Sequence, residues 1–239
     1  SGELNEEASA EVKKKVTVKV PGNGSGEVEV GLDAEAVKTL KEVDSVEIKT
    51  EVADFEITGD TFGEAAEGED ISLSARKVDS SEVPEGADVP DGSLVVDFEA
   101  RVGGSSVDSF SEPIKVSIPY RGDAENGESV TVFLLKDDGS IEPVGGIYDS
   151  ETGMVKFITG HFSKYFAKAS IREFDDIEGL SWAENAIEAM AAKGIINGKS
   201  DKAFDPYSSI TRAEFAALVA RMLRYEEGGE MSFKDVDHE

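Results

Sequence analysis

The segment SSITRAEF at residues 208–215 places an arginine, Arg212, in the first turn of an expected helix. Thr211 can be the N-cap of this helix and Glu214 can complete a capping box, so helix initiation explains both residues. Arg212 has no such explanation, because a cation at the positive end of a helix dipole costs up to about 1 kcal/mol. An anionic ligand would reverse the sign, since free N–H groups and a guanidinium favour a carboxylate. Arg212 is therefore either an anion-binding residue or an exposed arginine paired with Asp205 or Glu214.

Three further residues in this part of the chain have side chains suited to a sugar site. Trp182 is the one tryptophan of the chain and follows the expected start of a helix, where an indole ring either stacks on a sugar or fills a core. Asp176 is expected to organise the entry into that helix or a neighbouring repeat, with ligand binding as the less favoured role. Lys199 lies in a loop before the second helix, where it either adds a second cation or is solvated.

A different chemistry is suggested by His161, Phe162 and Ser163. A serine hydroxyl can attack the carbonyl of the residue before it when a histidine accepts its proton, which would cleave the chain between Phe162 and Ser163. The reaction also needs a strained peptide bond and a group that stabilises the oxyanion. The alternative is a strand in which Phe162 and Tyr165 pack and His161 caps the end of a sheet. A tripeptide carries little information, so this alternative is favoured.

No other motif in the sequence points to catalysis or to metal binding. Arg121, Gly122 and Asp123 form an Arg-Gly-Asp triplet, but glycine and aspartate are also what a turn requires. The chain has two histidines and no cysteine, and it has no HExxH, phosphate-loop or EF-hand spacing. We therefore expect no disulfide, no metal and no cofactor.

The charge of the chain argues against two classes of partner. Its 51 acidic and 24 basic residues give a formal net charge of −27, which repels nucleic acid and anionic membrane surfaces. No apolar run reaches the roughly 18 residues needed to cross a bilayer, and no signal peptide is evident. We expect neither a nucleic-acid partner nor membrane insertion.

Residues 11–169 are expected to form an antiparallel β-sandwich with one short helix, after a flexible segment at residues 1–10. Apolar residues alternate in the runs 16–20, 94–102, 114–118 and 130–134, and turn signals such as PGNGSG and KDDGS separate them. Many short strands with such turns are typical of a sandwich. The helix is expected within residues 32–42, with Asp33 as its N-cap.

After residue 170 the apolar period becomes helical, which predicts a helix, a loop and a second helix and makes the whole chain α+β. In SWAENAIEAMAAKG, Ser181 and Glu184 predict a capping box and Gly194 the end of the helix. The sequence FDDI at 174–177 recurs as FKDV at 233–236, which indicates that a second unit begins there. The apolar faces are expected at Ala183, Ile187 and Met190 in the first helix, and at Phe215, Leu218, Val219 and Met222 in the second.

Four sequence elements, FDDI, WAENAI, AAKGIINGKSDKAFDP and ITRAEF, stand in the order found in S-layer homology (SLH) domains. Residues 174–229 resemble one such repeat, so we expect a repeat at 170–229 and the truncated start of a second at 230–239. The β-rich part more loosely resembles modules that precede SLH repeats in surface proteins. The His-Phe-Ser tripeptide is similar to the self-cleavage site of certain ZU5 and nucleoporin domains.

The resemblance implies a noncovalent anchor, and not an enzyme, on the outside of mostly Gram-positive bacteria, in the cell wall or S-layer. SLH repeats usually occur in threes, and their grooves bind pyruvylated secondary cell wall polysaccharide. The missing repeats would come from the same chain or from a homotrimer. The family's binding arginine corresponds to Arg212, and the expected polysaccharide-binding residues are Arg212, Thr211, Glu214, Trp182, Asp176 and Lys199. The alternatives are a self-processing module and an S-layer assembly unit without a ligand of its own.

Overall fold

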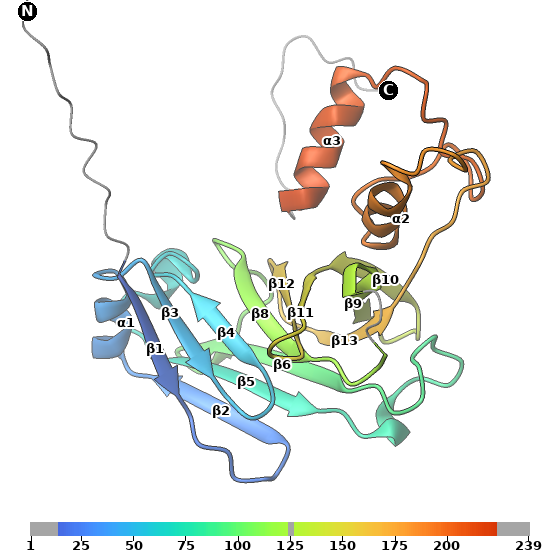
Figure 1. Cartoon of the computed structure of the whole chain (residues 1–239). Coiled ribbons are helices and arrows are strands. Elements are labelled where there is room, and N and C mark those ends of the chain that lie inside the picture. The colour runs from blue at the N-terminus through green and yellow to red at the C-terminus, as the bar shows by residue number, and fades with distance from the viewer. Residues whose placement is uncertain (1–13, 124–126, 224–239) are drawn as a thin grey trace, which may run out of the picture.

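The computed structural model describes residues 14–123 and 127–223, and these residues form two β-sheets followed by two helices (Figure 1). The segments 1–10 and 230–239, for which a flexible start and a second repeat are expected, lie outside the described residues. Sheet A has six strands, in the order β1 (Lys15–Lys19), β3 (Ser45–Lys49), β4 (Asp54–Ile57), β8 (Ile114–Pro119), β12 (Met154–Thr159) and β11 (Ile147–Asp149). Sheet B has seven, in the order β10 (Ile141–Gly145), β9 (Val130–Leu135), β13 (Lys164–Ala169), β6 (Val95–Val102), β5 (Ile71–Lys77) and β2 (Glu27–Leu32), with β7 (Ser105–Ser106) on β6.

The two sheets share one apolar core, to which each contributes alternate residues of its strands. The alternation predicted for residues 94–102 and 114–118 is confirmed, because it matches the buried residues of β6 and β8. Aromatic rings contact one another in this core. Those of Phe55 and Phe98 pack edge to face, with 5.7 Å between their centroids. The largest fully buried side chains include Tyr165, Phe55, Ile57, Leu73, Ile114 and Ile118.

Strand β1 departs from the expected sandwich in two respects. It pairs in parallel with β3, whereas an antiparallel arrangement is expected from the sequence. Val16 and Val18, expected in the core, are 43% and 44% exposed. The exposure follows from the position of β1 at the edge of sheet A, where it has a neighbour on one side only.

A second apolar cluster lies on the other face of sheet B. Val95, Phe133, Leu135 and Phe166 are buried there although their strand neighbours point into the main core. The connection between β5 and β6, which contains η2 (Ser80–Glu82), covers them. Strands β9 and β13 are therefore buried on both faces, which is why their sequences show weaker alternation. The covering side chains are Val78, Val83, Ala87 and Val89, together with Ile141 of β10.

The helix α1 (Ala34–Leu40) is the short helix expected between strands. Asp33 is its N-cap as predicted, since its carboxylate accepts a hydrogen bond from the Ala36 amide at 2.8 Å. Val37 and Leu40 are buried and attach the helix to the core. Two further short 3-10 helices are η1 (Gly63–Ala66) and η3 (Gly127–Ser129).

The two later helices are α2 (Glu184–Ala192) and α3 (Arg212–Leu223). The predicted Ser181–Glu184 capping box is wrong. The N-cap is Ala183, which makes no side-chain cap, and the Leu180 carbonyl accepts the amides of residues 183 and 184 in a preceding turn. Hydrogen bonds of this backbone turn satisfy the N–H groups that a capping side chain would otherwise bind.

The segment that contains α2 has a small apolar core of its own. Phe174, Ile177, Ile187, Ala191 and Ile196 are its buried members, and Leu218 of α3 packs against them. Met190, expected on the buried face of α2, is instead 39% exposed. On α3, Phe215 and Met222 are 60% and 56% exposed, so two of the four residues of the predicted apolar face are uncovered in the described structure.

Candidate functional site

The helix α3 begins with the capping box predicted from the sequence. The Thr211 hydroxyl accepts the Glu214 amide at 3.1 Å, and the Glu214 carboxylate accepts the Thr211 amide at 2.8 Å. The backbone N–H of Thr211, the ammonium of Lys199 and the Thr211 hydroxyl lower the pKa of Glu214 to about 2. Thr211 and Glu214 therefore build the helix start on which Arg212 is placed.

Arg212 is the first residue of this 12-residue helix, and its side chain is exposed. Among the residues that the structure describes, its guanidinium has no hydrogen-bond or ion-pair partner. The alternative of pairing with Asp205 or Glu214 is therefore not observed. A cation without a partner at the positive end of a helix is available for an anion.

Lys199 is close to the same helix start but is already paired. Its ammonium lies 2.9 Å from Glu214 Oε1, and this hydrogen bond raises the pKa of the lysine. Its positive charge is therefore compensated by a carboxylate within the segment. Of the two cations expected at the site, Arg212 is the one without such a partner in the described structure.

Asp176 organises the loop before α3, and not the entry into α2 as expected. Its carboxylate accepts the backbone amides of Phe204 at 2.8 Å and Asp205 at 2.7 Å, and these hydrogen bonds lower its pKa. Asp205 has a φ of 63°, a left-handed conformation that a non-glycine residue adopts only when other contacts support it. Asp176 thus acts on the site through the backbone of the loop.

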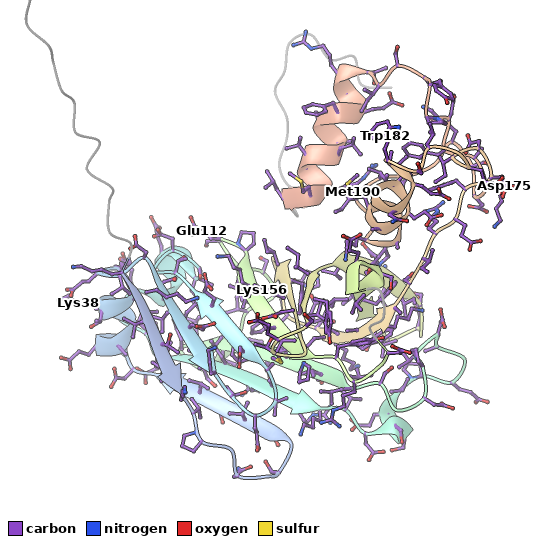
Figure 2. All side chains as sticks on the ribbon, in the orientation of Figure 1. Lys38, Glu112, Lys156, Asp175, Trp182 and Met190 are labelled. Carbon is purple, nitrogen blue, oxygen red and sulfur yellow. The ribbon has the colours of Figure 1, made fainter. Side chains whose placement is uncertain are left out.

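Trp182 is 86% exposed, so it does not belong to a core of the described residues (Figure 2). Its ring is free to stack on a flat partner in the described structure. Tyr207 is 84% exposed and lies in the loop before α3. Sequence reasoning missed Tyr207, although an aromatic residue directly after Pro206 in a polar loop was a signal for it.

A groove of about 560 Å³ runs between the loop before α3 and one side of that helix. Arg221, which was not singled out from the sequence, lines this groove, whereas Arg212 is not among the lining residues. The two arginines are nine residues apart and therefore lie on opposite sides of α3. Both polar and apolar side chains line it. Its lining includes Asn197, Lys199, Phe204, Ser208, Glu214 and Arg221.

The residues His161, Phe162 and Ser163 lie in a packed corner of the two sheets. The Phe162 ring contacts those of Phe98 and Phe110 at 5.3 and 4.9 Å between centroids. The His161 Nδ1 atom is 3.4 Å from the hydroxyl of Tyr165. The Ser163 carbonyl accepts the amide of Phe98 at 3.1 Å. These contacts agree with the favoured interpretation, in which the tripeptide is packed, and self-cleavage stays the less favoured, untested alternative.

Within residues 14–123 and 127–223, no three histidine or acidic groups come together as a ligand set for a metal ion. In the same ranges, no helix is both long and apolar enough to cross a membrane.

Residues 173–216 match the S-layer homology domain family, and the chain therefore carries an SLH domain in this segment. Similar proteins include an amylopullulanase of Thermoanaerobacterium thermosulfurigenes, 31% identical over 120 residues, which are 50% of this chain and 6% of that protein. The cellulosome-anchoring protein of Acetivibrio thermocellus is 44% identical over 66 residues, 27% of this chain and 14% of that protein. The surface-layer 125 kDa protein of Lysinibacillus sphaericus is 34% identical over 68 residues, 28% of this chain and 6% of that protein. The chain thus spans a small part of these relatives, and the likeness of its β part to ZU5-type domains stays a prediction.

Proposed function

We propose that this chain belongs to an exported bacterial surface protein and anchors it to the cell wall or S-layer through its SLH domain. The β-sandwich is then a spacer or a display module. The observation that carries the proposal is Arg212, an exposed guanidinium with no partner among the described residues at the start of α3. The names of the similar anchoring and surface-layer proteins support the same location.

The proposed ligand is an anionic wall polysaccharide with a carboxylate, such as a pyruvylated sugar. A guanidinium can bind a carboxylate with two parallel hydrogen bonds, and the helix dipole favours the same charge. Trp182 and Tyr207 offer exposed rings for the apolar faces of sugars. Because the chain carries a net charge of −27, we expect binding to depend on this local cation and on salt.

We further propose that α2, α3 and the loop between them form one SLH repeat, which packs against further repeats. Phe215 and Met222 support this, since both are more than half exposed on one side of α3. The further repeats would come from the same protein or from a homotrimer. Size-exclusion mass distinguishes these cases, because a trimer would elute at about three times 25.5 kDa.

No catalytic activity is proposed for this chain. The activity that the name amylopullulanase implies belongs to a protein of which the matched region is 6%. The matched family in this chain is an SLH domain, and the site described above has the geometry of binding and not of acid–base chemistry.

The proposal is tested by co-sedimentation with purified bacterial cell walls, with and without their secondary polysaccharide and with the pyruvyl groups removed. The variant is Arg212→Ala. The matched control is Arg121→Ala, which removes an exposed arginine from a turn of the sandwich. We expect the native chain and the control to pellet with intact walls, and Arg212→Ala to remain in solution.

Either of two results would overturn the proposal. If the native chain never pellets, this SLH domain has no ligand site of its own, and the alternative of an S-layer assembly unit is favoured. If Arg212→Ala pellets as well as Arg121→Ala, the polysaccharide is bound elsewhere.

A further inference from the structure

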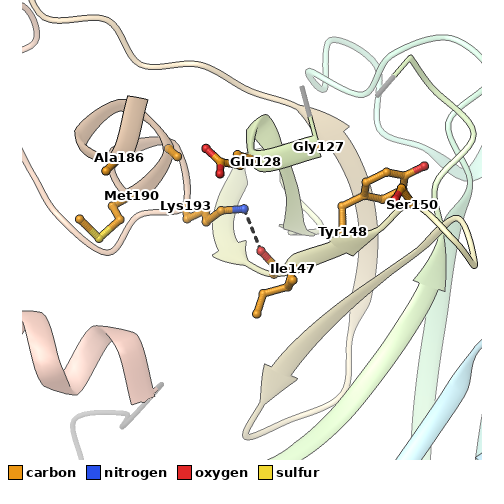
Figure 3. A pocket seen from close by; sticks show the side chains of 10 residues that line it. Gly127, Glu128, Ile147, Tyr148, Ser150, Ala186, Met190 and Lys193 are labelled. Atoms are coloured by element: carbon orange, nitrogen blue, oxygen red, sulfur yellow. Dashed lines mark hydrogen bonds between the residues drawn. The ribbon is translucent and has the colours of Figure 1, made fainter. Parts of the chain in front are cut away.

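A cleft of about 630 Å³ separates α2 from the sandwich (Figure 3). On one side it is lined by Ala186, Met190 and Lys193, and on the other by η3 and β11. Lys193 follows the last residue of α2 and extends across the cleft toward the sandwich. The contacts it makes there join two parts of the molecule that have separate cores.

The ammonium of Lys193 binds two backbone carbonyls of the sandwich. It donates to Gly146 O at 2.8 Å and to Val130 O at 2.9 Å. Val130 begins β9 in sheet B, and Gly146 lies between β10 of sheet B and β11 of sheet A. Lys193 thus binds the corner at which the chain passes from one sheet to the other.

The environment of Lys193 is that of an internal contact and not of a solvated surface lysine. Burial lowers the pKa of the lysine, and the nearby carboxylate of Glu128 only partly offsets this effect. A lysine half removed from water needs hydrogen-bond acceptors, and the two carbonyls provide them. The long apolar stem of lysine lets its ammonium reach them from the end of α2.

Two neighbouring contacts hold the same junction. Gly194 has a φ of 70°, and a Cβ atom on it would lie 2.9 Å from Pro143 Cγ of β10, so the chain approaches the sandwich as closely as glycine permits. The Ser170 amide, just after the last strand, donates to the Ser129 carbonyl at 2.8 Å. The junction is therefore held from both ends of the segment that contains α2.

We propose that Lys193 is a positioning residue that fixes the SLH domain in one orientation relative to the sandwich. Without its ammonium, the SLH domain would keep the Ser170–Ser129 hydrogen bond and the close approach of Gly194 to Pro143, and these two contacts alone would allow a wider range of orientations. The proposal goes beyond the anchoring function and holds whether or not Arg212 binds polysaccharide.

The absence of cysteine allows a direct test on the full chain, because spin labels can be placed at two introduced cysteines. We choose the exposed positions Lys156→Cys on β12 and Asp175→Cys in the SLH domain. The distance distribution between the labels is measured by pulsed electron paramagnetic resonance. It is compared between the native background, Lys193→Met and the control Lys202→Met, which removes an exposed lysine of the SLH domain.

We expect a single narrow distribution in the native background and in Lys202→Met, and a distribution at least about twice as broad in Lys193→Met. A distribution that stays narrow in Lys193→Met would overturn the proposal, as would one already broad in the native background. Hydrogen exchange of the α2 amides is measured in the same samples. If these amides exchange at the unfolded rate in Lys193→Met, the lysine supports the fold of the SLH domain and not its orientation, which also overturns the proposal.

Discussion

The ammonium of Lys199 lies 2.9 Å from the carboxylate of Glu214, which also accepts the N–H and O–H groups of Thr211. One glutamate therefore completes the capping box of α3 and compensates the nearest lysine. Arg212, between Thr211 and Glu214 in the sequence, has neither kind of contact in the described structure. The cation that helix formation disfavours is the one without a partner among the described residues.

Replacing Lys199 should affect wall binding little. An exposed ion pair contributes about 0–1 kcal/mol, so we expect Lys199→Ala to bind within about fivefold of the native chain. Loss of a charged hydrogen bond in Arg212→Ala costs about 1.5–3 kcal/mol, or roughly 10- to 150-fold. Both affinities can be measured by titration with solubilised wall polysaccharide. An equal loss of affinity in Lys199→Ala and Arg212→Ala would show that the ammonium of Lys199 also contacts the ligand.

The single tryptophan gives a spectroscopic test of its exposure and of the ligand contact. Because Trp182 is 86% exposed, its fluorescence should match that of a solvated indole and be fully quenched by acrylamide. Saturating wall polysaccharide should reduce this quenching if the ring stacks on a sugar. A blue-shifted, protected emission without ligand would contradict the described position of the ring.

Glu56, on the outer face of sheet A, should make the free energy of unfolding fall at acidic pH. Burial raises the pKa of Glu56, but hydrogen bonds from Lys115 and Lys15 outweigh it and lower the pKa to about 2, against 4.5 for a free glutamate. Since the folded pKa is depressed, this stability is fully present above pH 4.5 and is lost as the pH falls toward about 2. Melting temperatures of Glu56→Gln should therefore change less than those of the native chain between these pH values.

A matched substitution makes this pH test specific. Glu64→Gln removes an exposed glutamate of η1 that has no ion pair in the described structure, so its acid profile should follow that of the native chain. If Glu56→Gln and Glu64→Gln reduce the pH dependence of the melting temperature equally, general charge repulsion and not the Glu56 contacts governs the acid response.

The tripeptide His161, Phe162 and Ser163 should not cleave. We expect one species of 25.5 kDa by intact mass after prolonged incubation, because the histidine faces Tyr165 and the phenylalanine is packed among aromatic rings. Pieces of 162 and 77 residues that disappear in Ser163→Ala would refute this expectation.

The sequence predicted those features that depend on local patterns. The Asp33 cap, the Thr211 and Glu214 capping box and the alternation in β6 all follow from residues within a few positions of each other. The position of β1 at a sheet edge depends on strand order, which no local pattern contains.

The same distinction applies to the candidate site. Arg212 was recognisable because its type conflicts with its helical position. The pairing of Lys199, the exposure of Trp182 and the contacts of Lys193 with two carbonyls depend on tertiary packing and could not be predicted.

The connection between β5 and β6 also determines how this chain would fail under proteolysis. Its side chains Val78, Val83, Ala87 and Val89 cover Phe133 and Phe166 on the outside of sheet B, together with Ile141 of β10. A single nick in this connection would not open the main core, but it would expose a flat aromatic surface on an otherwise folded chain. The nicked protein would then be prone to aggregation before it unfolded. Limited digestion should therefore yield aggregates and not smaller soluble fragments.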